Sequence, residues 1–358
     1  VGGRIAAERA PDFASTRRAP GSAPRAEHIV RLPSQPGKRS TLSTIAHTDA
    51  APSPLGKGVL EIIGCQMIWG FMPIYWKLLS GVSALLVLDA RMIFSGVLML
   101  ALAAFVKRMR AGNLLRDPRA IRTFLASGCI ISLNWGVYIW ATNSGYLLEA
   151  SFGYYLCPLF TVLFGVFLFG ERMTVMQKIA LGLACTGVAS YVIIQGGMIW
   201  ISCALALTFS VYAAIKKKGG FDALRGMTFE SLITGVLGLA FFALASAFPA
   251  IWNATPPSYD ALAVSDGTLT CILLVIAGAL TVAPLLLYSA AANDVPFVIL
   301  GFMQYLSPTI SMLVAVFLFG EAFTLAHAIC FGLVWIGLAG VGIESVRNFK
   351  IAARKTNG

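Results

Sequence analysis

Residues 155–171 read YLCPLFTVLFGVFLFGE, and residues 305–321 read YLSPTISMLVAVFLFGE. The two stretches lie 150 residues apart, with Pro158 matching Pro308 and a Gly-Glu pair ending both. Apolar segments share leucines and valines by chance, but a proline and a Gly-Glu terminus in the same register indicate an internal repeat. A second match, Ser95-Gly-Val-Leu with Thr234-Gly-Val-Leu at a spacing of 139 residues, extends the repeat toward the N-terminus.

The composition around this repeat is that of a membrane protein. Of the 358 residues, 58% are apolar and 12% are charged, which is more apolar surface than a soluble protein of this length can bury. The charged residues gather between apolar runs of about 18–24 residues, the length that crosses a bilayer core of about 30 Å as a helix. We therefore predict an all-α membrane protein with ten transmembrane helices, near residues 59–79, 84–106, 123–141, 147–169, 176–195, 198–215, 226–248, 269–291, 296–319 and 323–345.

The basic residues mark one side of the membrane, because Lys and Arg are retained on the cytoplasmic side. Nearly all of the 27 Lys and Arg residues lie in the two tails or in every second link, and Lys77 and Arg91 are the exceptions. The alternate links, at 142–146, 196–197 and 249–268, contain none. This pattern requires an even number of spans and predicts that both termini are cytoplasmic. The net charge of +11 is then a topology signal and an attraction to anionic lipid, and not a nucleic-acid-binding surface.

Five spans per repeat is an odd number, so equivalent links lie on opposite sides of the membrane and the two repeats are inverted. We predict a first five-helix repeat at residues 58–196 and a second at 197–346, followed by a basic cytoplasmic tail at 347–358. Residues 1–57 are rich in Arg, Ser, Pro and Ala and lack apolar periodicity. They predict a disordered basic N-terminal tail or an artefact of an uncertain start site.

Arg91 is the most exceptional charge within the predicted spans, where a charge costs about 2.5–3.5 kcal/mol on insertion scales. It lies about two turns into the second span, and at the 139-residue spacing it corresponds to Glu230 in the seventh. Either both side chains reach the interface near helix ends, or they flank the substrate path. In the second case Arg91 attracts an anionic group of the substrate or forms a gate with Glu149.

Polar and aromatic side chains within the spans predict a mildly polar cavity suited to amphipathic organic solutes. Each of them alone is more often an interfacial anchor or a helix–helix hydrogen bond. The equivalent prolines Pro158 and Pro308 predict a symmetric hinge. The cavity candidates are Trp69, Asn134, Tyr138, Tyr155, Gln304 and Tyr305.

Several segments resemble the RarD-type permeases, bacterial members of the EamA family in the drug/metabolite transporter superfamily. They include Trp69-Gly-Phe-Met-Pro-Ile-Tyr-Trp-Lys77, Leu148-Glu-Ala-Ser-Phe-Gly-Tyr154 and Gly301-Phe-Met-Gln-Tyr-Leu-Ser-Pro308. The resemblance covers roughly residues 57–346. It implies a ten-helix permease of the bacterial inner membrane, with two EamA repeats, a central site and an association with chloramphenicol sensitivity.

The sequence thus predicts a secondary-active permease that moves a small organic metabolite or drug-like solute by alternating access between its repeats. It contains no GxxxxGK[ST] loop that would bind ATP, and its seven cysteines lie singly, so we expect no cofactor, no metal and no catalytic residue. The alternatives are a non-transporting receptor or scaffold and an intramembrane enzyme, which would need a nucleophile with a base or a metal cluster. Expected partners are the solute and membrane lipid; a homodimer stays open, and no nucleic acid is expected.

Overall fold

The computed structural model describes residues 54–107, 116–143, 146–195, 199–253, 257, 263–320 and 322–356. The predicted N-terminal tail lies outside the described residues except for its last four, which begin the first helix. Residues 51–358 form one compact unit.

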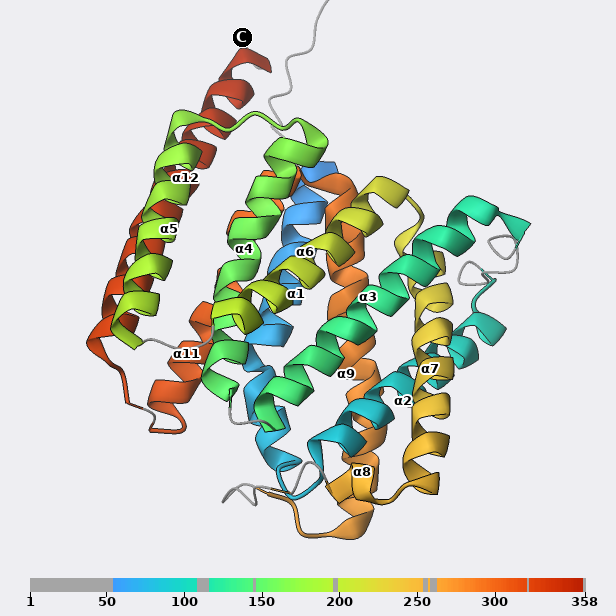
Figure 1. Ribbon diagram of the computed structural model, residues 1–358. Helices are drawn as coiled ribbons and strands as arrows, with labels where there is room; N and C mark the ends of the chain where they lie inside the picture. Colours follow the sequence, from blue (N-terminus) through green and yellow to red (C-terminus); the bar gives the residue numbers. More distant parts are fainter. Residues whose placement is uncertain are drawn as a thin grey trace, which may run out of the picture. The chain divides into compact units, whose positions relative to one another are not determined.

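All regular structure in the described residues is α-helical (Figure 1). The helices are α1 (Pro54–Leu78), α2 (Ala84–Phe105), α3 (Pro118–Asn143), α4 (Leu147–Phe169), α5 (Val175–Gln195), α6 (Ile199–Gly219), α7 (Ala223–Ala247), α8 (Ala250–Asn253), α9 (Gly267–Asp294), α10 (Phe297–Met303), α11 (Leu306–Phe317) and α12 (Leu325–Thr356).

Within this part of the chain, nine helical stretches are long and apolar enough to cross a bilayer, and α6 runs through the same bundle as a tenth (Figure 1). The short helices α10 and α11 together make one of these passages. The prediction of an all-α protein with ten transmembrane helices is confirmed. One boundary differs, because α12 continues to Thr356 through the basic segment that was expected to form a separate tail.

Both ends of this compact unit lie at the same end of the bundle, as an even number of passages requires (Figure 1). There α1 begins, α12 ends, and α6 connects to α7. We call it the basic end, because the last turn of α6 carries Lys216, Lys217 and Lys218, and the first turn of α7 carries Arg225. The opposite end, where α1 connects to α2 and α7 leads into α8, is called the far end.

The helices α2 and α7 cross at equivalent glycines of the two repeats, Gly96 and Gly235. A Cβ atom on Gly96 would lie 3.2 Å from Cα of Gly235, and a Cβ atom on Gly235 would lie 3.3 Å from Cα of Gly96. Small residues allow such close backbone approach between helices in a membrane. The repeat spacing of 139 residues makes these two glycines equivalent, so the crossing brings together matching positions of the two predicted repeats.

The ninth passage is broken, whereas its equivalent in the first repeat is not. One span was expected at 296–319, but α10 ends at Met303 and α11 begins at Leu306. Pro308 explains the break, because its ring crowds the carbonyl of Gln304, four residues earlier, and it has no N–H to donate. Pro158 lies inside α4, which stays continuous. The two prolines therefore differ in their local geometry, and a hinge role for them stays a prediction.

Candidate functional site

Arg91 lies among helices of both repeats in the far half of the bundle. Its Nε–H donates to the hydroxyl of Thr281 on α9 at 3.0 Å. Its guanidinium carbon lies 4.8 Å from the ring centroid of Trp76 on α1 and 5.1 Å from that of Trp135 on α3. A cation between aromatic faces gains up to about 2 kcal/mol from each when it is shielded from water. The residue as a whole is partly buried, and its guanidinium lies between the two ring faces.

Among the described residues, no carboxylate forms an ion pair with Arg91. Its predicted partner Glu149 lies in the first turn of α4, and the Glu149 side chain is outside the described part. The phenols of Tyr75, Tyr138 and Tyr154 act on the guanidinium electrostatically, but a phenol is neutral at pH 7. The charge is therefore left uncompensated by these neighbours. We call Arg91, Trp76, Trp135, Tyr138, Tyr154 and Thr281 the Arg91 site.

Glu230, the equivalent of Arg91 in the second repeat, is fully paired. Its Oε1 accepts a hydrogen bond from Tyr212 at 2.9 Å, and its Oε2 accepts one from Ser127 at 2.7 Å. Lys216 Nζ lies 2.9 Å from the same Oε2 and completes a buried salt bridge. With 1% of its surface exposed, Glu230 is enclosed by these partners. We call Ser127, Tyr212, Lys216 and Glu230 the basic-end lock.

A second ionic contact at the basic end was missed by the sequence reasoning. Glu171 follows Gly170, which ends α4 in a left-handed conformation at φ 64°. Its carboxylate accepts the backbone N–H groups of Phe297 at 2.6 Å and Val298 at 2.7 Å, the free donors at the start of α10. Lys217 Nζ lies 3.6 Å from Glu171 and donates to the carbonyl of Val295 at 2.7 Å. The repeated Gly-Glu terminus was its only signal in the sequence.

The predicted cavity residues near the middle of the bundle do meet. Gln304, at the break between α10 and α11, donates through Nε2 to the hydroxyl of Tyr288 at 2.7 Å and to Thr161 at 3.3 Å. The Tyr288 ring lies 5.8 Å from Trp69, which lies 5.8 Å from Phe209. Gln304 and Tyr288 are both buried. In this conformation the side chains form a packed polar-aromatic cluster.

The remaining candidates make contacts between helices. Asn134 donates to the Leu205 carbonyl and the Thr208 hydroxyl, both at 2.8 Å, and so joins α3 to α6. Tyr155 donates to the Pro308 carbonyl at 3.3 Å. Two further positions complete the predicted set: the Tyr138 ring lies 5.7 Å from Tyr154 in the Arg91 site, and Tyr305 is buried.

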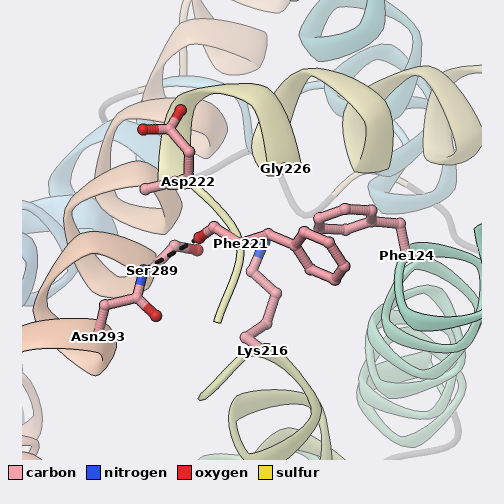
Figure 2. Close-up of a pocket in the computed structure, with 8 residues that line it drawn as sticks. Phe124, Lys216, Phe221, Asp222, Gly226, Ser289 and Asn293 are labelled. Carbon is pink, nitrogen blue, oxygen red and sulfur yellow. Dashed lines mark hydrogen bonds between the residues drawn. The ribbon is translucent and has the colours of Figure 1, made fainter. Parts of the chain in front are cut away.

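Two hollows lie at the basic end. The inner one, of about 10 Å³, lies beside Lys216 and Phe124 and has room for about one water molecule; Figure 2 shows the side chains that line it. Phe221 covers it, and its carbonyl accepts a hydrogen bond from Asn293 at 3.1 Å (Figure 2). Beyond it a surface hollow of about 590 Å³ is lined partly by Lys217 and Lys218. The basic end thus has an outer hollow, and beneath it the side chains around Lys216 leave little free space.

Comparison with known proteins adds to this geometry. Residues 56–193, which span α1 to α5, match the EamA-like transporter family. The chain is 36% identical over 299 residues to an uncharacterized transporter of Vibrio cholerae, covering 83% of this chain and 96% of the relative. It is 34% identical over 288 residues to Protein RarD of Salmonella typhimurium, covering 79% and 93%. A Pseudomonas aeruginosa relative named chloramphenicol-sensitive protein RarD is 29% identical over 305 residues, covering 84% and 98%.

A solved structure also shares the fold, with a TM-score of 0.62 at 19% identity over 79% of this chain and 96% of that one. The ten-helix bundle and these relatives define a multi-pass membrane transporter of a small solute. Within that class, the chain belongs to the EamA-like transporter family, in its RarD-type branch.

Proposed function

We propose that the protein is a secondary-active permease of the bacterial inner membrane, which moves a small organic solute with an anionic group by alternating access. The observation that carries the proposal is the environment of Arg91, an intramembrane charge between Trp76 and Trp135 with no ion pair to any described carboxylate. A charge at membrane depth is costly and marks a functional position by default. Arg binds planar carboxylates through paired hydrogen bonds, and the two indole rings suit a flat apolar body.

Alternating access is supported by the inverted repeats and by the unequal ends of the bundle. A solute-binding site near the axis can open to either side when one repeat rocks against the other. The basic-end lock and the Glu171–Lys217 contact hold one end closed. Opening that end requires the buried pair of Glu230 and Lys216 to part or move together, while the far end closes over the Arg91 site.

The orientation follows from the basic residues. Lys and Arg in short links are retained in the cytoplasm, so the basic end faces inward and both termini are cytoplasmic. The Arg91 site then lies in the half of the bundle that faces the outside. A site on that side binds a solute before import or releases it after export.

Binding of benzoate to the purified full-length protein tests the proposal. We expect benzoate to raise the melting temperature and to bind by titration calorimetry, with benzamide and benzylamine weaker by about tenfold or more because they lack the carboxylate. Arg91→Gln should abolish this preference. Lys77→Gln, which removes a far-end charge that lies over Phe319, should retain it. Equal binding of the three compounds, or the same loss in both variants, would contradict the site.

Transport itself separates a permease from the receptor, scaffold or enzyme alternatives. Proteoliposomes are loaded with a concentrated solute that shifts the melting temperature, from a panel of aromatic carboxylates and chloramphenicol, and labelled solute is added outside. A permease gives transient accumulation of label by counterflow, and Arg91→Gln abolishes it. A receptor or scaffold would bind the solute without accumulation, and an enzyme would convert it.

A further inference from the structure

A second acidic residue lies in the bundle without any assigned role. Asp89 on α2 has 1% of its surface exposed, and both of its carboxylate oxygens lack a hydrogen-bond partner in the described structure. Buried polar groups normally form hydrogen bonds, so a buried carboxylate with no hydrogen bond on either oxygen requires an explanation. Glu230, the other deeply buried acid, shows the usual solution, since three side chains donate to it.

Asp89 lies at the contact between the two repeats. Its Oδ1 is 3.4 Å from where a Cβ atom on Gly238 of α7 would lie, one turn from the crossing of Gly96 and Gly235. This contact must change if the repeats rock against each other, because α2 belongs to one repeat and α7 to the other. Asp89 therefore lies at a point where movement alters its exposure to water.

Among the described residues, no charged group on the neighbouring helices forms an ion pair or a hydrogen bond with the Asp89 carboxylate. Arg91, two residues further on α2, is engaged by Thr281 and the two tryptophans. Burial without any electrostatic partner is what distinguishes the Asp89 carboxyl. The titratable groups on the described parts of the helices that pack against α2 are Arg225 and Glu230 on α7, Cys271, Tyr288 and Asp294 on α9, and Arg119, Arg122, Cys129 and Tyr138 on α3.

An ionised carboxylate in this position would be buried without compensation, so the neutral acid is the form that fits. We infer that Asp89 is a proton-binding site that couples proton movement to movement of the solute. The inference rests on the proposed function. With an anionic solute bound at Arg91, protonation of Asp89 makes the net charge of the loaded site less negative by one unit than it is with Asp89 ionised. This lowers the free-energy cost of carrying the site through the membrane.

The site exists in one repeat only. At the 139-residue spacing Asp89 corresponds to Thr228, a neutral residue whose hydroxyl donates to the Leu224 carbonyl at 2.9 Å. The fold offers equivalent positions, but a proton can be held at the far-end position alone.

Infrared spectroscopy of the purified full-length protein tests proton binding without any solute. At about pH 5 the wild type should show the carbonyl band of a neutral carboxylic acid, and Asp89→Asn should weaken that band by the contribution of one carboxyl group. Asp266→Asn, which removes an exposed helix-capping carboxylate near the far end, should leave that band unchanged. If the wild type shows no such band, or if the Asp89→Asn variant shows it at the same strength, Asp89 does not hold the proton and the proposal is wrong.

Benzoate binding then tests the coupling. Benzoate stays ionised between about pH 6 and pH 9, and its negative charge favours the protonated form of the nearby Asp89. We expect the wild-type Kd to weaken about threefold or more across this range and the Asp89→Asn Kd to stay constant. A pH dependence that survives in Asp89→Asn would refute the coupling. Failure of benzoate to bind at all would instead count against the Arg91 site, while the infrared result still decides proton binding.

Discussion

Arg91 and Glu230 occupy equivalent positions in the two inverted repeats, yet their surroundings are opposite. Glu230 is buried and accepts hydrogen bonds from Ser127, Tyr212 and Lys216. Arg91 is partly exposed, makes one hydrogen bond to Thr281 and otherwise lies against two indole rings. The repeat dictates where the two residues lie in the bundle, but their neighbours decide what each can do.

This difference separates a structural charge from a free one. A fully paired carboxylate in a closed cluster holds helices together, whereas a guanidinium without a described counter-ion can still bind one. The same asymmetry recurs along the axis. The second repeat has a broken passage at Gln304, and the first repeat has the unpartnered acid Asp89.

The comparison predicts its largest effect at Glu230. Glu230→Ala leaves Lys216 buried without a partner, which should destabilise the protein by about 3–5 kcal/mol. Chemical denaturation in detergent measures the loss. The double variant Glu230→Leu/Lys216→Met should recover most of it, because replacing both partners removes the uncompensated charge. If Glu230→Ala unfolds like the wild type, the lock does not hold the basic end.

The crossing of α2 and α7 gives the next prediction. Gly96→Ala would place a Cβ atom 2.9 Å from the Ser231 carbonyl, a backbone atom that cannot rotate away, so the helices must separate at a cost of about 1–3 kcal/mol. Gly182→Ala is the matched control, because a Cβ atom there meets nothing within 4 Å. Gly235→Ala should cost about as much as Gly96→Ala if the contact lies on the two-fold axis. Thermal unfolding of the three variants compares them, and equal stability of all three would argue against close contact at the crossing.

Some features of this fold can be predicted from the sequence, and others cannot. The ten passages were predictable because hydropathy and the Lys and Arg distribution belong to each segment by itself. The repeat also related α2 to α7 through Gly96 and Gly235. The break at Gln304 was not predictable from the proline that follows it. Pro158, which the repeat matches to Pro308, lies inside a helix that stays unbroken. Whether a proline interrupts its helix depends on which neighbouring groups form hydrogen bonds with the carbonyl group four residues earlier.

The candidate site was predictable in part for the same reason. Arg91 stood out because a charge within a span is costly wherever it lies. Its contacts with Trp76 and Trp135 depend on how α1 and α3 rotate about their axes, which no single segment specifies. The pairing of Lys216 with Glu230 likewise joins two helices at a depth that only packing determines.

The Glu171 contact provides a smaller effect and a test of symmetry. Glu171→Gln keeps one acceptor oxygen but loses the charge that binds two N–H groups of α10 and Lys217, which should cost about 1–2 kcal/mol. The repeat spacing of 150 residues relates Glu171 to Glu321, and Phe297 and Val298 to the first turn of α4. Glu321 lies outside the described residues, and the repeat predicts that Glu321→Gln costs a similar amount. Thermal unfolding of both variants measures this, and a loss at Glu171 alone would show that the ends are held differently.

The smallest effect on stability is expected at Arg91, although its equivalent Glu230 has the largest. Arg91→Gln loses a hydrogen bond to Thr281 and two contacts with indole rings, but it also removes from the membrane interior a charge that no described carboxylate pairs. These terms oppose each other, so the free energy of unfolding should change by about 1 kcal/mol or less. Denaturation of Arg91→Gln beside Glu230→Gln makes the comparison at equal side-chain size. A loss at Arg91 as large as that at Glu230 would mean that Arg91 is a structural charge, already paired, with no capacity left for an anionic solute.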